Sequence, residues 1–313
     1  MNKRLSVLKS FGEVYHYVNE SEKFYKRNLG LLWEFFILIQ LFKFKGYSFK
    51  QKTNVLIERR DSQGEFLRFI HQPKHQAFLH FYKNNKNVLK VFHKPDYSEE
   101  TIRSLASVCS EIFAEDLYKI NKLIKNKDIV MDIGANIGIF SLAVKERYPN
   151  TQIIAFEPEK DNFQQLKRNL NKYTKINLNN VAVGESVAKK MLRTSESNLV
   201  NSIEDTSDFD SNPNYQSAQM VSVINIDKYI KINADVMKLD IEGYESFALK
   251  GAKKTIKKNS PLIIISADHS RMQKKNIIIL MKDIDKSYKY IDLGNSILCF
   301  YKKKKHGDRI KKL

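Results

Sequence analysis

The chain has 313 residues, 42% of them hydrophobic, and its formal net charge at pH 7 is +19. This hydrophobic fraction supports a packed core, so the composition excludes a protein that is disordered throughout. The positive charge suits anionic partners such as nucleic acid or lipid head groups, although a lysine-rich proteome would produce the same excess. Cys109 and Cys299 lie far apart in the sequence, so we expect no disulfide framework, no cysteine zinc site and a reducing, cytoplasmic environment.

Residues 1–95 are predicted to form an extension that precedes the main domain. The first 45 residues have apolar positions at helical spacing. Within them, segment 29–42 (LGLLWEFFILIQLF) is too short to span a bilayer and contains Glu34 and Gln40. We expect a helix packed on the domain. A helix lying in a membrane interface is the alternative, because basic residues flank the segment.

From residue 53 onward, the apolar spacing changes to that of β-strands. Two pairs of strand-like segments, each around a polar turn, predict a small antiparallel meander. Four of the seven histidines fall near these strands (His71, His75, His80 and His93). Pro73 interrupts the first pair, so we expect surface histidines rather than a metal site.

Residues 96–301 are predicted to form the main domain. A helix start signal in segment 94–100 introduces a helix that we expect to continue through EIFAEDLYKINKLI (111–124). From residue 128 onward, apolar strands alternate with helical patterns, which is typical of a doubly wound α/β fold with a mostly parallel sheet. The last two strands (YKYIDLG and SILCFYKK) have no helix between them, so they predict an antiparallel pair at one edge.

Two polar segments do not follow this pattern. Segment 194–219 is predicted to be a long loop, and loops of this length in compact domains are usually functional or mobile. Segment 302–313 (KKKKHGDRIKKL) is predicted to be a disordered, solvated basic tail, with contact to an anionic surface as the alternative.

Segment 129–140 (IVMDIGANIGIF) predicts a strand ending at Asp132, a turn containing Gly134 and Gly138, and the start of a helix. Such a unit presents free backbone N–H groups to a nucleotide-like ligand. The dinucleotide fingerprint has one more glycine, and an acid at the strand end suits a cation better than a phosphate. S-adenosylmethionine carries an ammonium, a sulfonium and no phosphate. The segment therefore favours this methyl donor, with Asp132 serving its ammonium directly or through water.

The second and third strands also carry candidate cofactor residues at their carboxyl ends. Glu157 ends the second strand, where a carboxylate accepts both ribose hydroxyls. Its spacing from Gly138 would suit a dinucleotide equally well. Segment 180–182 follows the third strand, at the place that borders the adenine ring in such folds.

The fourth and fifth strands carry the candidate catalytic residues. Asp240 and Glu242 follow the fourth strand, and His269 follows the fifth. Asp240 or His269 is a candidate to deprotonate a substrate hydroxyl. Helix capping is the alternative role for Glu242, and a solvent-exposed position is the alternative for His269.

These residues resemble the FkbM-type class I methyltransferases over residues 111–267. The resemblance rests on DIGANIGIF, on FEP at Glu157, on NVAVGE (180–185) and above all on KLDIEGYE (238–245). Members of that family are mostly O-methyltransferases that use S-adenosylmethionine and act on hydroxyls of sugars and small metabolites. The resemblance implies that Glu157 holds the ribose and that Glu115 or Tyr118 lies near the cofactor. It also implies that Ser202 corresponds to a serine that the family often has.

The same resemblance implies a methionine site lined by Asp132, Gly134, Asn136 and Gly138. The chain departs from the family at the fifth strand, where it has Ser266-Ala-Asp-His269 and many members have a glutamate.

We therefore predict a Rossmann-like, S-adenosylmethionine-dependent methyltransferase that modifies a hydroxyl on a small molecule or glycan. No metal site is assigned, and a divalent ion on Asp240 that acidifies the hydroxyl is the alternative to a general base. The predicted cofactor residues are Asp132, Gly134, Ala135, Asn136, Gly138, Glu157, Pro158, Val181, Ala182 and Asp240. The predicted catalytic residues are Asp240, Glu242 and His269.

Two alternatives remain open. An RNA or protein methyltransferase is suggested by the charge, but the chain has no NPPY-like motif and no basic stripe interleaved with aromatic residues, so we do not expect a nucleic-acid partner. A non-catalytic cofactor-binding module at a membrane surface is the other. Peripheral contact with an anionic membrane is kept as an additional interaction.

Overall fold

The structure is a computed structural model that describes residues 55–60, 66–72, 78–83, 86–93, 99–113, 115–195, 201–203, 215–229, 233–267 and 271–313. The predicted N-terminal helical region, residues 1–45, and His269 lie outside the described residues.

A seven-stranded sheet with the strand order β14-β15-β13-β12-β5-β6-β7 forms the centre of the main domain. Its parallel strands are β5 (Ile129–Ile133), β6 (Gln152–Phe156), β7 (Ile176–Asn179), β12 (Val236–Leu239) and β13 (Leu262–Ser266). The edge strands β14 (Lys289–Asp292) and β15 (Ile297–Tyr301) are antiparallel. The predicted fold class, including the antiparallel edge pair, is confirmed.

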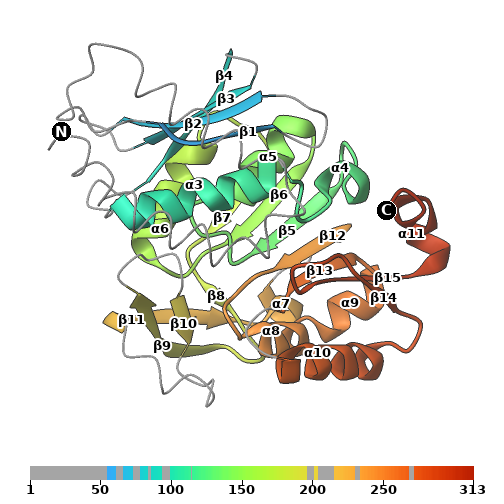
Figure 1. Cartoon of the computed structure of the whole chain (residues 1–313). Coiled ribbons are helices and arrows are strands. Elements are labelled where there is room, and N and C mark those ends of the chain that lie inside the picture. Colours follow the sequence, from blue (N-terminus) through green and yellow to red (C-terminus); the bar gives the residue numbers. More distant parts are fainter. Residues whose placement is uncertain are drawn as a thin grey trace, which may run out of the picture.

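Helices cover both faces of this sheet (Figure 1). On one face lie α3 (Glu99–Phe113), α5 (Ile139–Arg147) and α6 (Lys160–Leu170). On the other lie α8 (Glu245–Gly251), α9 (Lys253–Asn259) and α10 (Arg271–Ile284). Alternate strand residues enter opposite cores, with Val130 and Ile264 packing on the first side and Met131 and Ile263 on the second. Both faces are buried, which explains why the strands read as continuous apolar runs.

The predicted meander before the main domain is confirmed as an antiparallel sheet of β1 (Val55–Arg60), β2 (Phe66–Gln72), β3 (Phe78–Lys83) and β4 (Lys86–Phe92). Its last strand docks on α6. The side-chain amide of Asn169 accepts a bond from the Phe92 N–H at 2.6 Å and donates to the Phe92 carbonyl at 3.0 Å. One buried asparagine thus satisfies the backbone of the strand end.

The single helix expected through residues 111–124 is wrong. Helix α3 ends at Phe113, and α4 is a separate turn (Ile120–Leu123). Asp116 and Lys119 between them have left-handed backbone conformations. The carboxylate of Asp116 accepts the N–H groups of Ile120 and Asn121 at 2.8 and 3.1 Å. This cap starts a new helix instead of continuing the first one.

The loop predicted for residues 194–219 is also wrong in part, because strands occupy much of it. A second sheet with the order β10-β9-β11-β8 contains β8 (Ala182–Val183), β9 (Ala188–Ser195), β10 (Asn201–Ile203) and β11 (Tyr215–Ile224). Its apolar side chains Leu192, Val221 and Val223 pack on Tyr244. A few apolar residues at alternate positions suffice for strands whose other face is polar. The helical turn α7 (Ile226–Tyr229) follows.

The C-terminal segment, predicted to be disordered, is a helix, α11 (Lys303–Ile310). The Arg309 guanidinium donates to both oxygens of Asp128 at 2.5 and 2.9 Å, and Lys302 pairs with Asp285 at 2.7 Å. These acidic partners are distant in sequence, so a local reading of the basic run cannot anticipate them. No helix in the described part of the chain is long and apolar enough to cross a membrane.

Candidate functional site

A cavity lies at the carboxyl ends of β5, β6 and β12, and α3 supplies part of its wall. It is the place where open α/β sheets bind ligands. Eight of the predicted cofactor residues line it: Gly134, Ala135, Asn136, Glu157, Pro158, Val181, Ala182 and Asp240. The predicted catalytic residue Glu242 and the candidate Tyr118 line it as well.

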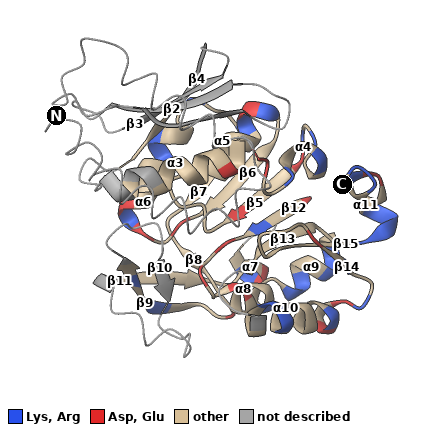
Figure 2. Cartoon of the chain, viewed as in Figure 1, with Lys and Arg blue, Asp and Glu red and all other residues tan. Residues whose placement is uncertain are grey.

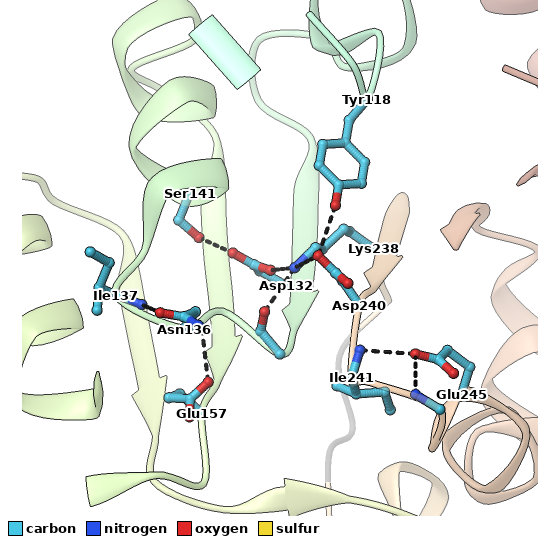
Figure 3. Close-up of polar contacts among 12 residues, drawn as sticks. Tyr118, Asp132, Asn136, Ile137, Ser141, Glu157, Lys238, Asp240, Ile241 and Glu245 are labelled. Carbon is cyan, nitrogen blue, oxygen red and sulfur yellow. Dashed lines mark hydrogen bonds and ion pairs between the residues drawn. The ribbon is translucent and has the colours of Figure 1, made fainter. Parts of the chain in front are cut away.

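Glu157 follows β6 and is buried against the cavity. Its Oε2 atom accepts the Asn136 N–H at 2.8 Å (Figure 3). Its Oε1 atom accepts the Glu159 N–H at 2.9 Å. Burial raises the pKa of Glu157 to about 7, although these two backbone donors oppose the shift. Each carboxylate oxygen keeps acceptor capacity for a ligand hydroxyl.

The backbone donors of the turn after β5 are not free, contrary to the sequence prediction. Gly134 and Ala135 donate to the Phe156 carbonyl at 3.0 and 2.9 Å. The Asn136 N–H is bound by Glu157, and the Ile137 N–H donates to the Asn136 side chain at 2.7 Å. A phosphate would find no open backbone donor in residues 134–137, so these turn residues do not form a pyrophosphate cradle by themselves.

The two glycines of the turn have different structural roles. Both have positive φ, +78° at Gly134 and +95° at Gly138. A Cβ atom at Gly134 would lie 1.9 Å from the Asp240 carbonyl oxygen, whereas one at Gly138 would lie 2.7 Å from the Leu166 side chain. Gly134 therefore allows the ends of β5 and β12 to touch. Gly138 packs on α6 and does not line the cavity, and its assignment to the cofactor stays a prediction.

Asp132, another predicted cofactor residue, does not line the cavity. Its side chain is fully buried. Oδ2 accepts a bond from the Ser141 hydroxyl at 2.6 Å, and Oδ1 lies 3.1 Å from Nζ of Lys238 (Figure 3). The lysine neutralises the carboxylate that was expected to receive a ligand ammonium.

Lys238 is the central cation of the site, and sequence reasoning did not single it out. Its Nζ atom donates to the Gly134 carbonyl at 2.8 Å and lies 3.7 Å from Oδ2 of Asp240, in addition to its contact with Asp132. Burial alone would lower the pKa of Lys238, but the two carboxylates together hold it above the ordinary value. The lysine thus stays charged and ties β5 to the end of β12.

Asp240 presents the carboxylate that faces the cavity at the end of β12. The Tyr118 hydroxyl donates to its Oδ2 atom at 2.8 Å, and the Tyr118 ring packs edge-on against Phe140 with centroids 5.3 Å apart. The break between α3 and α4 places Tyr118 here. Asp240 is therefore held on one side by a phenol and an ammonium.

The turn after Asp240 is held by Glu245, which is completely buried. Its Oε1 atom accepts the Ile241 N–H at 2.9 Å, and its Oε2 atom accepts the Gln273 side chain at 2.5 Å. Glu242 follows Ile241 in this turn, lines the cavity and has a left-handed backbone conformation, with φ 53°. Such a conformation in a residue other than glycine is typical of functional turns.

The remaining predicted residues are not brought to the cavity. Glu115 is exposed and does not line it. Ser202 lies in β10, paired with Arg193 of β9. His269 is outside the described residues. Among the described residues, no group of three or more His, Cys, Asp or Glu side chains is placed to hold a metal ion.

The signal that could have revealed Lys238 is its position. It stands in the apolar run VMKLDI of a central parallel strand, where both faces are buried. A lysine there requires a buried carboxylate partner. The partner is Asp132, which lies on the neighbouring strand in direct register with Lys238 and which the sequence had already indicated as a candidate residue.

A family model described as the methyltransferase FkbM domain matches residues 132–291. The chain belongs to the FkbM methyltransferase family. The match includes Asp132, Glu157, Lys238 and Asp240, so the whole strand-end constellation falls within the family domain.

Curated relatives match over short segments. Methyltransferase sdnD of Sordaria araneosa is 48% identical over 63 residues, which is 20% of this chain and 24% of that protein. Methyltransferase 1 of Beauveria bassiana is 37% identical over 60 residues, 19% of this chain and 24% of that protein. The chain thus matches about a quarter of the length of these relatives.

Among solved structures, a methyltransferase FkbM from Methylobacillus flagellatus aligns with 65% of this chain and 55% of its own, at 20% identity and a TM-score of 0.44. A tRNA (uracil-54, C5)-methyltransferase from Pyrococcus abyssi aligns with 68% of this chain and 41% of its own, at 10% identity and a TM-score of 0.38.

Proposed function

We propose that this FkbM-family protein is an S-adenosylmethionine-dependent O-methyltransferase that acts on a hydroxyl of a sugar, a glycan or another small metabolite. The proposal rests on two features that lie side by side: the Glu157 carboxylate and the turn after β5, whose backbone N–H groups are bound within the protein. A carboxylate with free acceptor capacity faces the cavity, while the backbone N–H groups of the turn, residues 134–137, are all used within the protein. This combination favours a nucleoside ligand without phosphate groups.

The residues around Glu157 fit the other parts of such a nucleoside. Pro158, Val181 and Ala182 provide an apolar wall beside the carboxylate, and apolar walls suit an adenine ring. The side chain of Asn180 donates to the carbonyls of Glu157 and Pro158 at 2.8 and 3.1 Å. It therefore fixes the two strand ends relative to each other without contacting the cavity itself.

The charge of the cavity also fits a cationic ligand. Glu157, Asp240 and Glu242 line the wall together with one cation, Lys238. The overall charge of the chain is positive, yet this wall carries more acidic than basic groups. An ammonium and a sulfonium are favoured in such surroundings.

When bound, S-adenosylmethionine supplies an electrophilic methyl group. We assign to Asp240 the task of orienting and deprotonating the acceptor hydroxyl. Tyr118 and Lys238 hold its Oδ2 atom, so its position is fixed before the acceptor arrives. Positioning of this kind supplies much of the rate when the electrophile is already activated. Glu242 and His269 remain second candidates for contact with the acceptor.

Two of the curated relatives are named methyltransferases, and another, AmbE of Pseudomonas aeruginosa, is named an antimetabolite synthetase. These names support methyl transfer to a small metabolite. Both cysteines are buried and free, which supports the reducing, cytoplasmic compartment that we propose for the reaction.

The proposal is tested in two steps. Calorimetry of the full chain with S-adenosylhomocysteine should show one binding site, and Glu157→Gln should weaken it. Tritiated methyl transfer from S-adenosylmethionine to fractionated cell extract should then label a glycan or small-metabolite fraction. Absence of nucleoside binding would overturn the cofactor assignment, and label in RNA or protein would overturn the acceptor class.

A further inference from the structure

A second concave site lies at the opposite end of the sheet from the cofactor cavity. A groove of about 340 Å³ is formed by α11 together with residues of the edge strands β14 and β15. Its lining includes five lysines and one acidic residue: Lys289, Lys303, Lys304, Lys305, Lys311 and Asp308. Figure 2 shows the basic residues of α11 at the edge of the domain. Asp128, which anchors α11, precedes β5, whereas the cavity follows the other end of that strand.

The helix that carries these lysines is fixed by other side chains. Arg309 is held by both oxygens of Asp128, and Lys302 is paired with Asp285. His306 is buried, and its Nδ1 atom accepts the Lys302 N–H at 3.0 Å. These contacts hold α11, and with it the groove lysines, in place.

The start of α11 has the reverse of the charge that a helix favours. Lys303, Lys304 and Lys305 form its first turn, with no acidic residue there and no side chain that caps the free N–H groups. The first-turn N–H groups carry partial positive charge, so cations at this end destabilise a helix and anions stabilise it.

The groove lysines also lack compensation around them. Among the described residues, Lys289, Lys303, Lys304 and Lys311 form no ion pair, and Lys305 donates only to the Asn259 carbonyl, at 2.5 Å. Gly307 lines the same groove, and a Cβ atom there would meet nothing within 4 Å. Packing does not require a glycine at this helical position, whereas a ligand that approaches the backbone closely would.

We propose that this groove binds a compact, phosphate-bearing anion. Such a ligand would neutralise the lysines that line the groove and accept the N–H groups of Lys303 and Lys304 at the start of α11, whereas the Lys305 N–H already donates to the Lys302 carbonyl. Lysines act as point charges toward phosphate and do not demand a planar partner. The concave shape favours a compact anion over a flat membrane. Tyr301 is the one aromatic residue of the lining, whereas single-stranded nucleic acid is usually bound on several stacked aromatics.

The experiment uses the full chain and inorganic pyrophosphate as the probe. Calorimetry at a salt concentration of about 0.1 M should detect one site in the wild type. The variant Lys303→Glu/Lys304→Glu/Lys311→Glu should weaken pyrophosphate binding roughly tenfold or more, because it replaces three lysines of the groove lining with acidic residues. The matched control Lys167→Glu/Lys189→Glu/Lys228→Glu changes three exposed lysines on α6, β9 and α7 by the same charge, and it should retain binding.

Each outcome decides the proposal. Equal loss of binding in the two triple variants would indicate unspecific attraction to a basic protein and would overturn it. Binding of phosphatidylglycerol vesicles or RNA by the wild type, without pyrophosphate binding, would overturn it in favour of a macromolecular surface. Binding of S-adenosylhomocysteine should be unchanged in both variants, so the test does not depend on the proposed methyl transfer.

Discussion

The two ends of the seven-stranded sheet handle charge in opposite ways. At the carboxyl end, one buried ammonium is bracketed by two carboxylates, 3.1 and 3.7 Å away. At the amino end, Arg309 and Asp128 form a matched pair, but the lysines beside them have no acidic partner among the described residues. The net charge of the chain therefore does not describe the charge of the cavity wall. The excess is on the surface, while the cavity is acidic.

The largest effect should come from breaking the balance at the carboxyl end. Lys238→Met removes the cation and leaves Asp132 charged, with only its Ser141 bond. We expect the free energy of unfolding in urea to fall by about 3–5 kcal/mol, because an uncompensated buried charge is costly. The double variant Lys238→Met/Asp132→Asn should recover most of this loss. A single variant within about 1 kcal/mol of the wild type would refute a balanced buried pair.

A smaller loss is expected when the matched pair at the amino end is broken. In Arg309→Met, Asp128 loses both guanidinium bonds but keeps the Lys125 N–H, at 2.8 Å. We expect a loss of about 2 kcal/mol in urea denaturation, in the range of hydrogen bonds to charged groups. Loss of α11 should also abolish the cationic groove. If Arg309→Met costs more than Lys238→Met, the two ends do not differ as described.

The acidity of the cavity predicts a pH dependence of cofactor binding. Burial raises the pKa of Glu157 to about 7, and only its ionised form accepts two hydroxyl donors. Affinity for S-adenosylhomocysteine should therefore fall about tenfold, or about 1.4 kcal/mol, for each pH unit below 7 and level off above it. Calorimetry between pH 5.5 and 8, taken as about the range of stable folding, would measure this slope.

Glu157→Gln provides the control, because it should bind more weakly but without that slope. The stability of the wild type should change in the opposite sense. The unfolded chain releases this proton near pH 4.5, and the folded chain holds it to about pH 7. The folded state thus binds more protons in this window, and its stability declines as the pH rises through it. If the affinity of the wild type did not depend on pH, the proposed contact between Glu157 and the ligand hydroxyls would be refuted.

The smallest effect concerns the uncompensated lysines. Lys304→Glu places an acid in the first turn of α11, where the N–H groups have no cap. We expect thermal unfolding to show a stabilisation of about 0.3–1 kcal/mol at low salt, which diminishes at about 1 M salt. Lys304→Gln should give about half of it. Destabilisation by the glutamate would show that the lysines already have local compensation.

Much of the fold follows from local patterns in the chain. The apolar runs of β5, β6, β12 and β13 are buried on both faces, so their composition alone indicates central parallel strands. The antiparallel edge was predictable because no helix separates β14 from β15. The sheet of β8 to β11 was not predictable in the same way, because the segment between β9 and the end of β11 is largely polar and the burial of Leu192, Val221 and Val223 depends on their contact with Tyr244.

The site was predictable where one side chain acts alone, and it was not where two must be considered together. Glu157 and Asp240 could be placed because strand ends meet the crevice. The ion pair of Asp132 could not be predicted because its partner, Lys238, is 106 positions away. From the sequence, the backbone N–H groups of the turn after β5 looked open to a ligand. In the structure they are bound by the Phe156 carbonyl at the end of β6 and by the Glu157 side chain that follows it. These pairings exist only once the sheet has formed.

The contact between Gly134 and the Asp240 carbonyl has a practical meaning for engineering. A methyl group added at Gly134 would occupy space that the neighbouring strand end already fills, at 1.9 Å. A mutant library aimed at a new acceptor should therefore leave both strand ends untouched. It should instead vary the face of α3 that lines the cavity, where Leu105, Val108 and Ile112 contribute to the wall from a separate helix. Changes there can reshape the entrance while the floor keeps its geometry.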